Sequence, residues 1–354
     1  MRRPLIYTVL CAAFAASLVI SSTTLRAQQA PRQTAPPAAQ QQQGPPIVTE
    51  VRLVDVIFTV LNRRQKFVTD LTKENFQVFE DGQPQDIRFF SRQTDLPLRV
   101  GMLLDTSNSI RDRMKFEQEA ATDFFFSNIR RGKDQAFLMI FDNEPSIIED
   151  FTGDTDKLRD TINRQRSGGG TALYDAIYVA CSERLSKPPL PSGPSPEVRR
   201  VLVVISDGDD THSVRAKSES IEACQRAGVV VYAISTSTQW VAATEAADPT
   251  KRANRKIFKE PGDNTLDQLT KETGGRAFFP YRVDDLAQSF QDIGDELRSQ
   301  YSLAYVPQSK SIDGAFRKIK IEVDRKGLIV RARKGYYVPR TVTITPASTR
   351  PPAQ

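Results

Sequence analysis

Three separated pieces of this sequence carry oxygen-bearing side chains that suit a metal ion. Asp105, Ser107 and Ser109 lie in the stretch Asp-Thr-Ser-Asn-Ser, directly after a strongly apolar segment. Thr171 follows three consecutive glycines, and Asp207 follows a second apolar segment. Two carboxylates and three hydroxyls, with no thiolate and no imidazole among them, form a donor set for a hard cation. The pieces together predict a half-filled coordination shell that leaves room for waters and one outside ligand.

The elements that must position these pieces are the strands of one sheet. Residues 98–105 and 198–205 are nearly all apolar, which is typical of strands covered on both faces. We expect further strands at 135–141, 146–151, 229–234 and 276–279, and helices at 111–129, 155–164, 216–226, 264–273 and 283–298 and after Thr171. Because a short turn joins 135–141 to 146–151, that pair is expected to be antiparallel. The alternation predicts an α/β, doubly wound, Rossmann-like domain with a mainly parallel sheet, whose ligand-binding edge carries all three pieces.

Both flanks of this domain are rich in strand patterns. Before it, we expect strands at 51–61 and 75–80, a turn at Asp81-Gly82 and a return strand at 87–90. After it, we expect strands at 301–306 and 316–323, a turn at Gly327 and a return strand at 328–332. So few strands rarely stand alone, and we therefore predict that the two flanks pair into one small β-sandwich-like module. The alternative is two separate β extensions.

The order of the three pieces resembles a known family. Asp-x-Ser-x-Ser, then Thr, then Asp, on an alternating α/β chain over roughly residues 97–299, resembles the von Willebrand factor type A (VWA) domain. The resemblance implies that the five residues form a metal-ion-dependent adhesion site (MIDAS), with no departure from the motif. It further implies that Mg²⁺ binds there, with Mn²⁺ or Ca²⁺ as alternatives, and that a protein partner's acidic side chain completes the coordination.

The wider layout resembles a bacterial exported group called VWFA-related. The residues that carry this second resemblance are Phe-x-Val-x-Glu-Asp-Gly at 76–82 and the closing Gly-Tyr-Tyr at 335–337. Each motif piece alone has an ordinary explanation, since Asp and Ser are frequent in turns and helix caps. The glycines before Thr171 do not form a phosphate loop, because no Gly-Lys-Ser/Thr follows them.

A partner-binding rim is expected around the metal, formed by Asp209, Asp210 and Trp240. Trp240 lies in a long irregular stretch, 237–262, with a basic cluster formed by Lys251, Arg252, Arg255 and Lys256. Long loops are usually functional or disordered. One interpretation is a selectivity loop that steers an acidic partner toward the metal, and the other is a solvated insertion.

The remaining reactive side chains are few. His212 is the only histidine and lies in a polar loop, where a solvated position is the ordinary interpretation and a hydrolytic centre the alternative. No nucleophile elbow accompanies it, so we expect no enzymatic activity and no catalytic residue. Cys181 and Cys224 fall on predicted helices, and the strand order of the VWA domain that this chain resembles implies that both helices lie on one face of the sheet. A disulfide and two buried thiols both remain open from the sequence.

The amino terminus predicts export. Residues 1–27 combine a basic start, an apolar run at 5–20 and an Ala27 cleavage position, which together indicate a signal peptide. An uncleaved anchor is the alternative. Residues 28–47 predict a Pro/Gln-rich linker, and residues 340–354 a disordered tail. The expected location is periplasmic or secreted, with no membrane span after cleavage.

Composition excludes several classes of function. The formal charge of +6 falls to about +3 once Arg2, Arg3 and Arg26 are removed, which is too small to indicate nucleic acid binding. A mean hydropathy of −0.42 excludes a multi-pass membrane protein. One His and three Cys exclude a His-rich zinc site and a disulfide-dense scaffold.

The sequence therefore predicts an exported, metal-dependent protein-binding module. Its parts would be a β-rich segment at 48–96, the VWA domain at 97–299 and C-terminal strands at 300–339. The alternatives are an envelope scaffold whose metal is structural only and, less favoured, a metal-dependent hydrolase. The oligomeric state is left open.

Overall fold

The computed structural model describes residues 53–92, 96–111, 114–186, 198–237, 260–280 and 283–339. Every described residue belongs to one compact unit, Glu50–Gln354. The predicted signal peptide, linker and tail, together with Trp240 and the basic cluster, lie outside the described residues. Within the described residues, no helix is long and apolar enough to cross a membrane.

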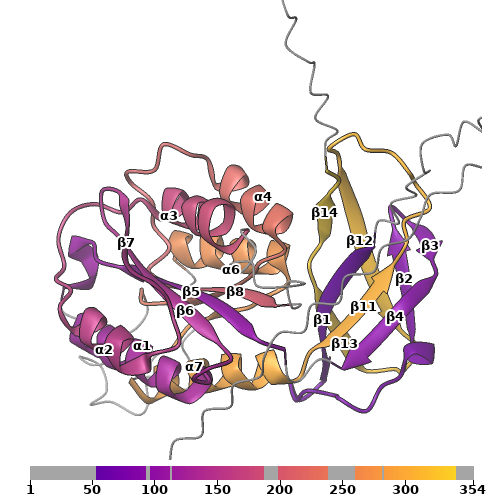
Figure 1. The fold of residues 1–354 in the computed structure, drawn as a ribbon, viewed down its shortest axis with the longest axis horizontal. Helices are drawn as coiled ribbons and strands as arrows, with labels where there is room; N and C mark the ends of the chain where they lie inside the picture. Colours follow the sequence, from indigo (N-terminus) through magenta and orange to yellow (C-terminus); the bar gives the residue numbers. More distant parts are fainter. Residues whose placement is uncertain are drawn as a thin grey trace, which may run out of the picture. The chain divides into compact units, whose positions relative to one another are not determined.

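A six-stranded sheet forms the centre of the α/β part (Figure 1), in the order β10-β9-β8-β5-β6-β7. All neighbouring strands are parallel except β6 and β7, as their short connection requires. The strands are β5 (Leu98–Asp105), β6 (Gln135–Phe141), β7 (Pro145–Thr152), β8 (Arg199–Ser206), β9 (Val230–Ser235) and β10 (Ala277–Phe278). The predicted doubly wound fold with a mainly parallel sheet is thereby confirmed.

Helices cover both faces of this sheet, which is why β5 is buried along its whole length. On one face lie α1 (Met114–Asn128), α2 (Thr155–Asn163) and α7 (Val283–Arg298). On the other lie α3 (Leu173–Val179), the π-helical turn η3 (Ala180–Leu185), α4 (Lys217–Ala227) and α6 (Pro261–Thr273). Each face has its own apolar core, and successive residues of β5 and β8 alternate between the two.

The two flanks of the chain form a β-sandwich in which both sheets mix early and late strands. One sheet has the order β13-β1-β11-β4 and the other β14-β12-β2-β3. The strands are β1 (Val54–Asn62), β2 (Phe76–Glu80), β3 (Gln83–Gln85), β4 (Ile87–Arg92), β11 (Tyr301–Tyr305), β12 (Phe316–Val323), β13 (Leu328–Ala332) and β14 (Gly335–Tyr337). The predicted pairing of the flanks is confirmed, with buried aromatic rings of Phe58, Phe76 and Tyr301 in contact at its centre.

In two predicted hairpins, the strands pair with other strands than the predicted ones. The turn at Asp81-Gly82 has positive φ at both residues, as expected, but the return strand is β3 rather than residues 87–90. Residues 87–92 instead pair with β11 in the other sheet, where Ile87 is buried in the shared core. Likewise β13 leaves β12 after Gly327 and pairs with β1. A sandwich buries one face of each sheet, so consecutive strands change sheets to close the common core.

A disulfide joins Cys181 on η3 to Cys224 on α4. The sequence left this bond open against two free thiols, because spacing along the chain does not determine distance. The structure brings the two Cα atoms to 4.9 Å, and both side chains are fully buried. The bond therefore links two of the elements that cover this face of the sheet, η3 and α4.

A buried carboxylate at the end of α7 connects the α/β part to the sandwich. Glu296 is fully buried and pairs with Arg331 on β13 at 2.7 Å. It also accepts a hydrogen bond from the hydroxyl of Thr59 on β1 at 3.2 Å. Because one carboxylate binds both strands, the last turn of α7 is held against the sandwich.

Candidate metal site

Asp105 ends β5 at the carboxyl edge of the sheet and is fully buried. Its Oδ1 accepts a hydrogen bond from the backbone N–H of Ser107 at 2.9 Å, and its Oδ2 accepts one from the Ser206 hydroxyl at 2.7 Å. Because Ser206 is the last residue of the adjacent parallel strand, the register of β5 and β8 determines this contact. The carboxylate is therefore held in one orientation before any ion binds.

The environment of Asp105 disfavours its charge in the absence of a cation. Burial raises the pKa of Asp105 to about 6, hydrogen bonds from Ser206 and Ser107 lower it, and the charge of Asp207 raises it. Burial and the charges of Asp207, Glu260 and Asp263 also raise the pKa of Asp209. Several carboxylates thus repel one another at one sheet edge, and a bound cation would relieve that repulsion.

The first loop after β5 presents two neighbouring hydroxyls. The Oγ atoms of Ser107 and Ser109 lie 2.9 Å apart. Thr106 holds the loop to the adjacent strand through its backbone N–H, which donates to the carbonyl of Phe141 at 3.0 Å. The backbone N–H of Asn108 donates to the carbonyl of Gly169 at 3.3 Å, which brings the glycine-rich loop alongside.

Thr171 lies in a loop whose backbone is hydrogen-bonded to the neighbouring loops at this edge of the sheet. Its N–H donates to the Thr211 hydroxyl at 3.1 Å, and its carbonyl accepts from the backbone of Thr211 at 2.9 Å. On either side, Gly168 N–H donates to the Thr106 carbonyl and Ala172 N–H to the Asp142 carbonyl, both at 2.7 Å. None of these bonds uses the side-chain hydroxyl of Thr171, which stays available to a metal.

Asp207 begins the third loop, which is pressed against the start of α6. Gly208 has φ +83°, and a Cβ there would lie 2.2 Å from the carbonyl oxygen of Gly262. A Cβ at Gly262 would in turn lie 2.2 Å from the carbonyl of Asp207. Both positions therefore require glycine. This pair is not visible in the sequence, because its members are far apart in the chain and a lone glycine after Asp207 suggests only a turn.

The predicted rim residues have different surroundings. Asp209 is exposed, whereas Asp210 accepts hydrogen bonds from the backbone of Tyr174 at 3.0 Å and from the Ser213 hydroxyl at 2.6 Å. The carboxylate of Asp210 thus anchors the first turn of α3 to the third loop. His212 is exposed, with its ring over Gly170 and its Nδ1 2.8 Å from the Thr211 hydroxyl. Trp240 lies outside the described residues.

Three loops therefore meet at one edge, with the five predicted ligands distributed among them. In the part of the chain that the structure describes, no group of three or more His, Cys, Asp or Glu side chains is placed to hold a metal ion. The candidate site contains only the carboxylates of Asp105 and Asp207. A cation bound here would need the three hydroxyl oxygens and water to complete its shell, so all of its ligands would be oxygen atoms.

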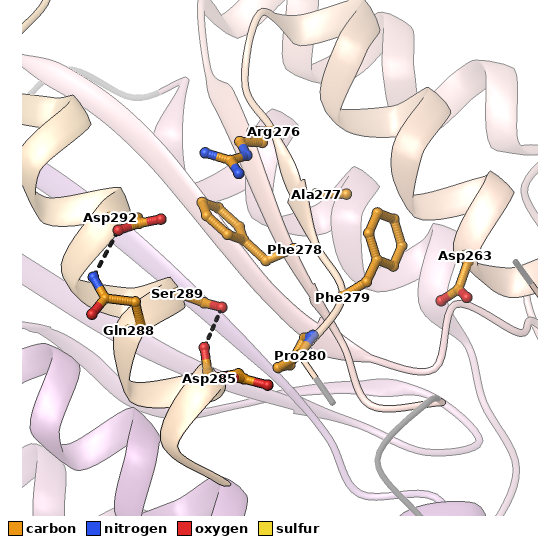
Figure 2. A pocket seen from close by; sticks show the side chains of 10 residues that line it. All are labelled: Asp263, Arg276, Ala277, Phe278, Phe279, Pro280, Asp285, Gln288, Ser289 and Asp292. Atoms are coloured by element: carbon orange, nitrogen blue, oxygen red, sulfur yellow. Dashed lines mark hydrogen bonds between the residues drawn. The ribbon is translucent and has the colours of Figure 1, made fainter. Parts of the chain in front are cut away.

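A separate cavity of about 370 Å³ lies between β10 and α7. Figure 2 shows the β10 segment with Phe278 and Phe279 on one side and α7 on the other, with α7 contributing Asp285, Gln288, Ser289 and Asp292. The side chains on α7 bond within the helix, Gln288 to Asp292 at 2.9 Å and Ser289 to the Asp285 carbonyl at 2.7 Å. None of the five predicted metal ligands lines this cavity, so it is distinct from the candidate metal site.

Residues 100–209 match the family described as von Willebrand factor type A domain. The matched segment includes all five predicted ligands, and it confirms the resemblance that their order indicated. No curated protein sequence matches the chain. The match does not extend to the sandwich, so the likeness to the VWFA-related group stays a prediction.

Several solved structures are similar to this chain. An aerotolerance-related membrane protein from Bacteroides fragilis is 18% identical, over 56% of this chain and 98% of that one, with a TM-score of 0.42. Proximal thread matrix protein 1 from the mussel byssus, solved with a zinc-occupied MIDAS motif, is 14% identical, over 61% and 50%, with a TM-score of 0.45. A von Willebrand factor type A protein from Catenulispora acidiphila is 11% identical, over 84% and 76%, with a TM-score of 0.45.

Proposed function

We propose that this chain, which contains a von Willebrand factor type A domain, is an exported, metal-dependent protein-binding module. The observation that carries the proposal is the convergence of three loops on the buried, prepositioned carboxylate of Asp105. Asp105, Ser107, Ser109, Thr171 and Asp207 would hold the ion, which supplies a concentrated positive charge at the sheet edge. Asp105 and Asp207 are the two carboxylates among the proposed ligands, and the remaining ligands are neutral hydroxyls and water. A coordination position held by water could therefore take a carboxylate oxygen from a partner.

The loops perform distinct tasks in this proposal. Asp105 and Asp207 retain the cation, and the hydroxyls of the first and second loops orient the remaining coordination positions. A partner carboxylate would replace a bound water, so the partner's affinity would depend on the cation. Asp209 is exposed and follows Asp207 closely in the third loop. Its negative charge would repel an acidic partner, except where the partner's carboxylate is placed to bind the metal directly. Asp210 would act indirectly, by holding the third loop to α3.

Export is proposed on two grounds. Residues 1–27 have the pattern of a signal peptide, and the Cys181–Cys224 disulfide is a bond that persists in an oxidising compartment. We propose a periplasmic or secreted location on this basis. No catalytic residue is included in the proposal. His212 is exposed at the rim, where its ring hydrogen-bonds the Thr211 hydroxyl.

The test removes one ligand atom while the shape of the loop is kept. Thr171→Val replaces the available hydroxyl with a methyl group, and Thr122→Val makes the same change on α1, where the hydroxyl only bonds the Gln118 carbonyl. Calorimetric titration of Mg²⁺ into the metal-free chain should show binding to the wild type and to T122V, and at least roughly tenfold weaker binding to T171V. Equal binding by all three would refute the assignment of the site.

A second arm addresses the partner. Selection of displayed peptides in Mg²⁺ should enrich sequences with Asp or Glu that are released by a chelator, and T171V should not retain them. Mg²⁺ binding without any such enrichment would favour the scaffold with a structural metal. Metal-dependent turnover that disappears in Asp207→Ala would favour the hydrolase.

A further inference from the structure

Both short motifs of the sandwich lie in one sheet, and a cavity opens on that sheet. The stretch Phe-x-Val-x-Glu-Asp-Gly forms β2 and the turn after it, and Gly-Tyr-Tyr forms β14. β12 lies between the two strands and is antiparallel to both. The cavity has a volume of about 890 Å³ and is lined by residues of β2, β12 and the end of α6. None of the five predicted metal ligands lines it.

Two phenylalanine rings form the apolar part of the cavity. Phe79 extends outward from β2, because the residues on either side of it are buried in the sandwich. Phe316 lies across Gly335, where a Cβ would be 2.4 Å from the ring, and its ring centre is 5.0 Å from that of Tyr337. The Gly-Tyr-Tyr motif therefore determines where Phe316 lies. Both rings are only partly buried, so they offer apolar surface to a ligand.

Some of the charged side chains at the cavity already have partners. Lys320 pairs with Glu322 on the same face of β12 at 2.5 Å. Asp81 pairs with Arg317 at 3.8 Å, and its carboxylate also accepts a backbone N–H from β12 at 2.8 Å. These groups hold the strands and their turn together, so they contribute little to the binding of a ligand.

Lys318 and Lys334 differ, because their ammonium groups form no ion pair with a side chain in the described part of the chain. Both side chains are exposed and line the cavity. The third lining carboxylate, that of Glu272 on α6, also has no ion-pair partner among the described residues. Two unpaired cations against one unpaired anion favour a ligand with a single negative charge.

The α6 wall of the cavity is fixed to the sandwich and lies far from the metal site. The Glu272 carbonyl accepts the backbone N–H of Lys334 at 3.4 Å and the side-chain amide of Gln225 at 3.0 Å. Gly262, at the other end of α6, lies against the third loop, so about 15 Å of helix separates the two sites. A ligand in the cavity therefore does not compete with a cation at the metal site.

We infer that this cavity binds a small molecule with one carboxylate and an apolar ring. Its volume of about 890 Å³ is within the range of small-molecule sites, about 300–1,000 Å³. The rings of Phe79 and Phe316 pack against the ring of the ligand. The ammonium groups of Lys318 and Lys334 donate to its carboxylate.

The probe is cinnamate, a phenyl ring with one carboxylate, and its control is cinnamamide, which has the same ring without the charge. Binding to the full chain is titrated by saturation-transfer NMR in a chelator, so that the carboxylate does not act through a cation at the metal site. Lys318→Gln combined with Lys334→Gln removes both unpaired charges, and Lys326→Gln in the turn after β12 is the matched control. Phe79→Ala removes one ring, and its control is Phe89→Ala on β4, where the side chain is 63% exposed.

Cinnamate should bind equally to the wild type, K326Q and F89A, and roughly tenfold more weakly to the double lysine variant and to F79A, because charged hydrogen bonds or a ring contact are lost. The affinity for cinnamamide should not respond to the lysine changes. Glu272→Gln should bind cinnamate more tightly, since a repelling carboxylate is removed, and damaged folding would not produce this gain. The lysine changes affect exposed side chains, so they test the site even if F79A does not fold. No saturable binding of cinnamate to the wild type, or equal binding to all variants, would overturn the inference.

Discussion

Substitution of the buried carboxylate of Asp105 tests the electrostatics of the metal site. Asp105→Asn removes the charge and keeps the shape. The ordinary pKa of an Asp is 3.8 and that of Asp105 is about 6, so its charged form is disfavoured in the fold by about 3 kcal/mol. The penalty is fully present above about pH 6 and disappears as the pH falls toward 4, because the carboxyl group is then protonated in both states. D105N carries no such penalty at any pH.

The expected result is that the difference in the free energy of unfolding between the wild type and D105N changes with pH. In metal-free buffer, the free energy of unfolding of the wild type should rise relative to D105N by about 3 kcal/mol between pH 7 and pH 4. Mg²⁺ at pH 7 should reverse the order, since a ligand at a thousand times its Kd adds about 4.1 kcal/mol to the protein that binds it, which exceeds the penalty of about 3 kcal/mol. Urea unfolding at each pH, with and without Mg²⁺, measures both effects.

The control is Asp123→Asn, an exposed carboxylate on α1. It should leave the pH dependence and the Mg²⁺ effect unchanged. Parallel curves of unfolding free energy against pH for the wild type and D105N would refute the argument that burial raises the pKa of this group. An equal gain from Mg²⁺ in both proteins would show that Asp105 is not a ligand.

Other substitutions test the contacts that hold the loops and the two parts together. Gly208→Ala should destabilise by more than 2 kcal/mol in urea and weaken Mg²⁺ binding, whereas Gly82→Ala, with the same φ of +83° and nothing within 4 Å, should cost about 1 kcal/mol. Reduction of the Cys181–Cys224 disulfide, which spans 43 residues, should cost about 4 kcal/mol, measured by urea unfolding with and without a thiol. Glu296→Gln should cost about 3 kcal/mol, because the arginine on β13 then lacks its buried counter-charge; an unchanged urea midpoint would contradict this.

Local patterns in the sequence were sufficient for the α/β part and for the order of the metal-site pieces. Residues 98–105 and 198–205 were predicted to be buried strands because most of their side chains are apolar, and β5 and β8 are such strands. The helix expected at 283–298 has the bounds of α7. The carboxyl ends of such strands lie at one edge, so Asp105 and Asp207 were expected to be neighbours, and the charge of Asp207 does act on Asp105.

Tertiary structure decided everything that depends on pairing between distant residues. The turn at Asp81-Gly82 was visible in the sequence. Whether the next strand stays in the same sheet, however, depends on which of the two sheets buries its apolar side chains in the common core. The approach of Gly208 to Gly262 and the bond between Cys181 and Cys224 were undetermined for the same reason, since distances across a fold are set by packing. The sequence indicates which strands form and which of their ends share an edge, whereas packing decides which individual side chains from distant segments come into contact.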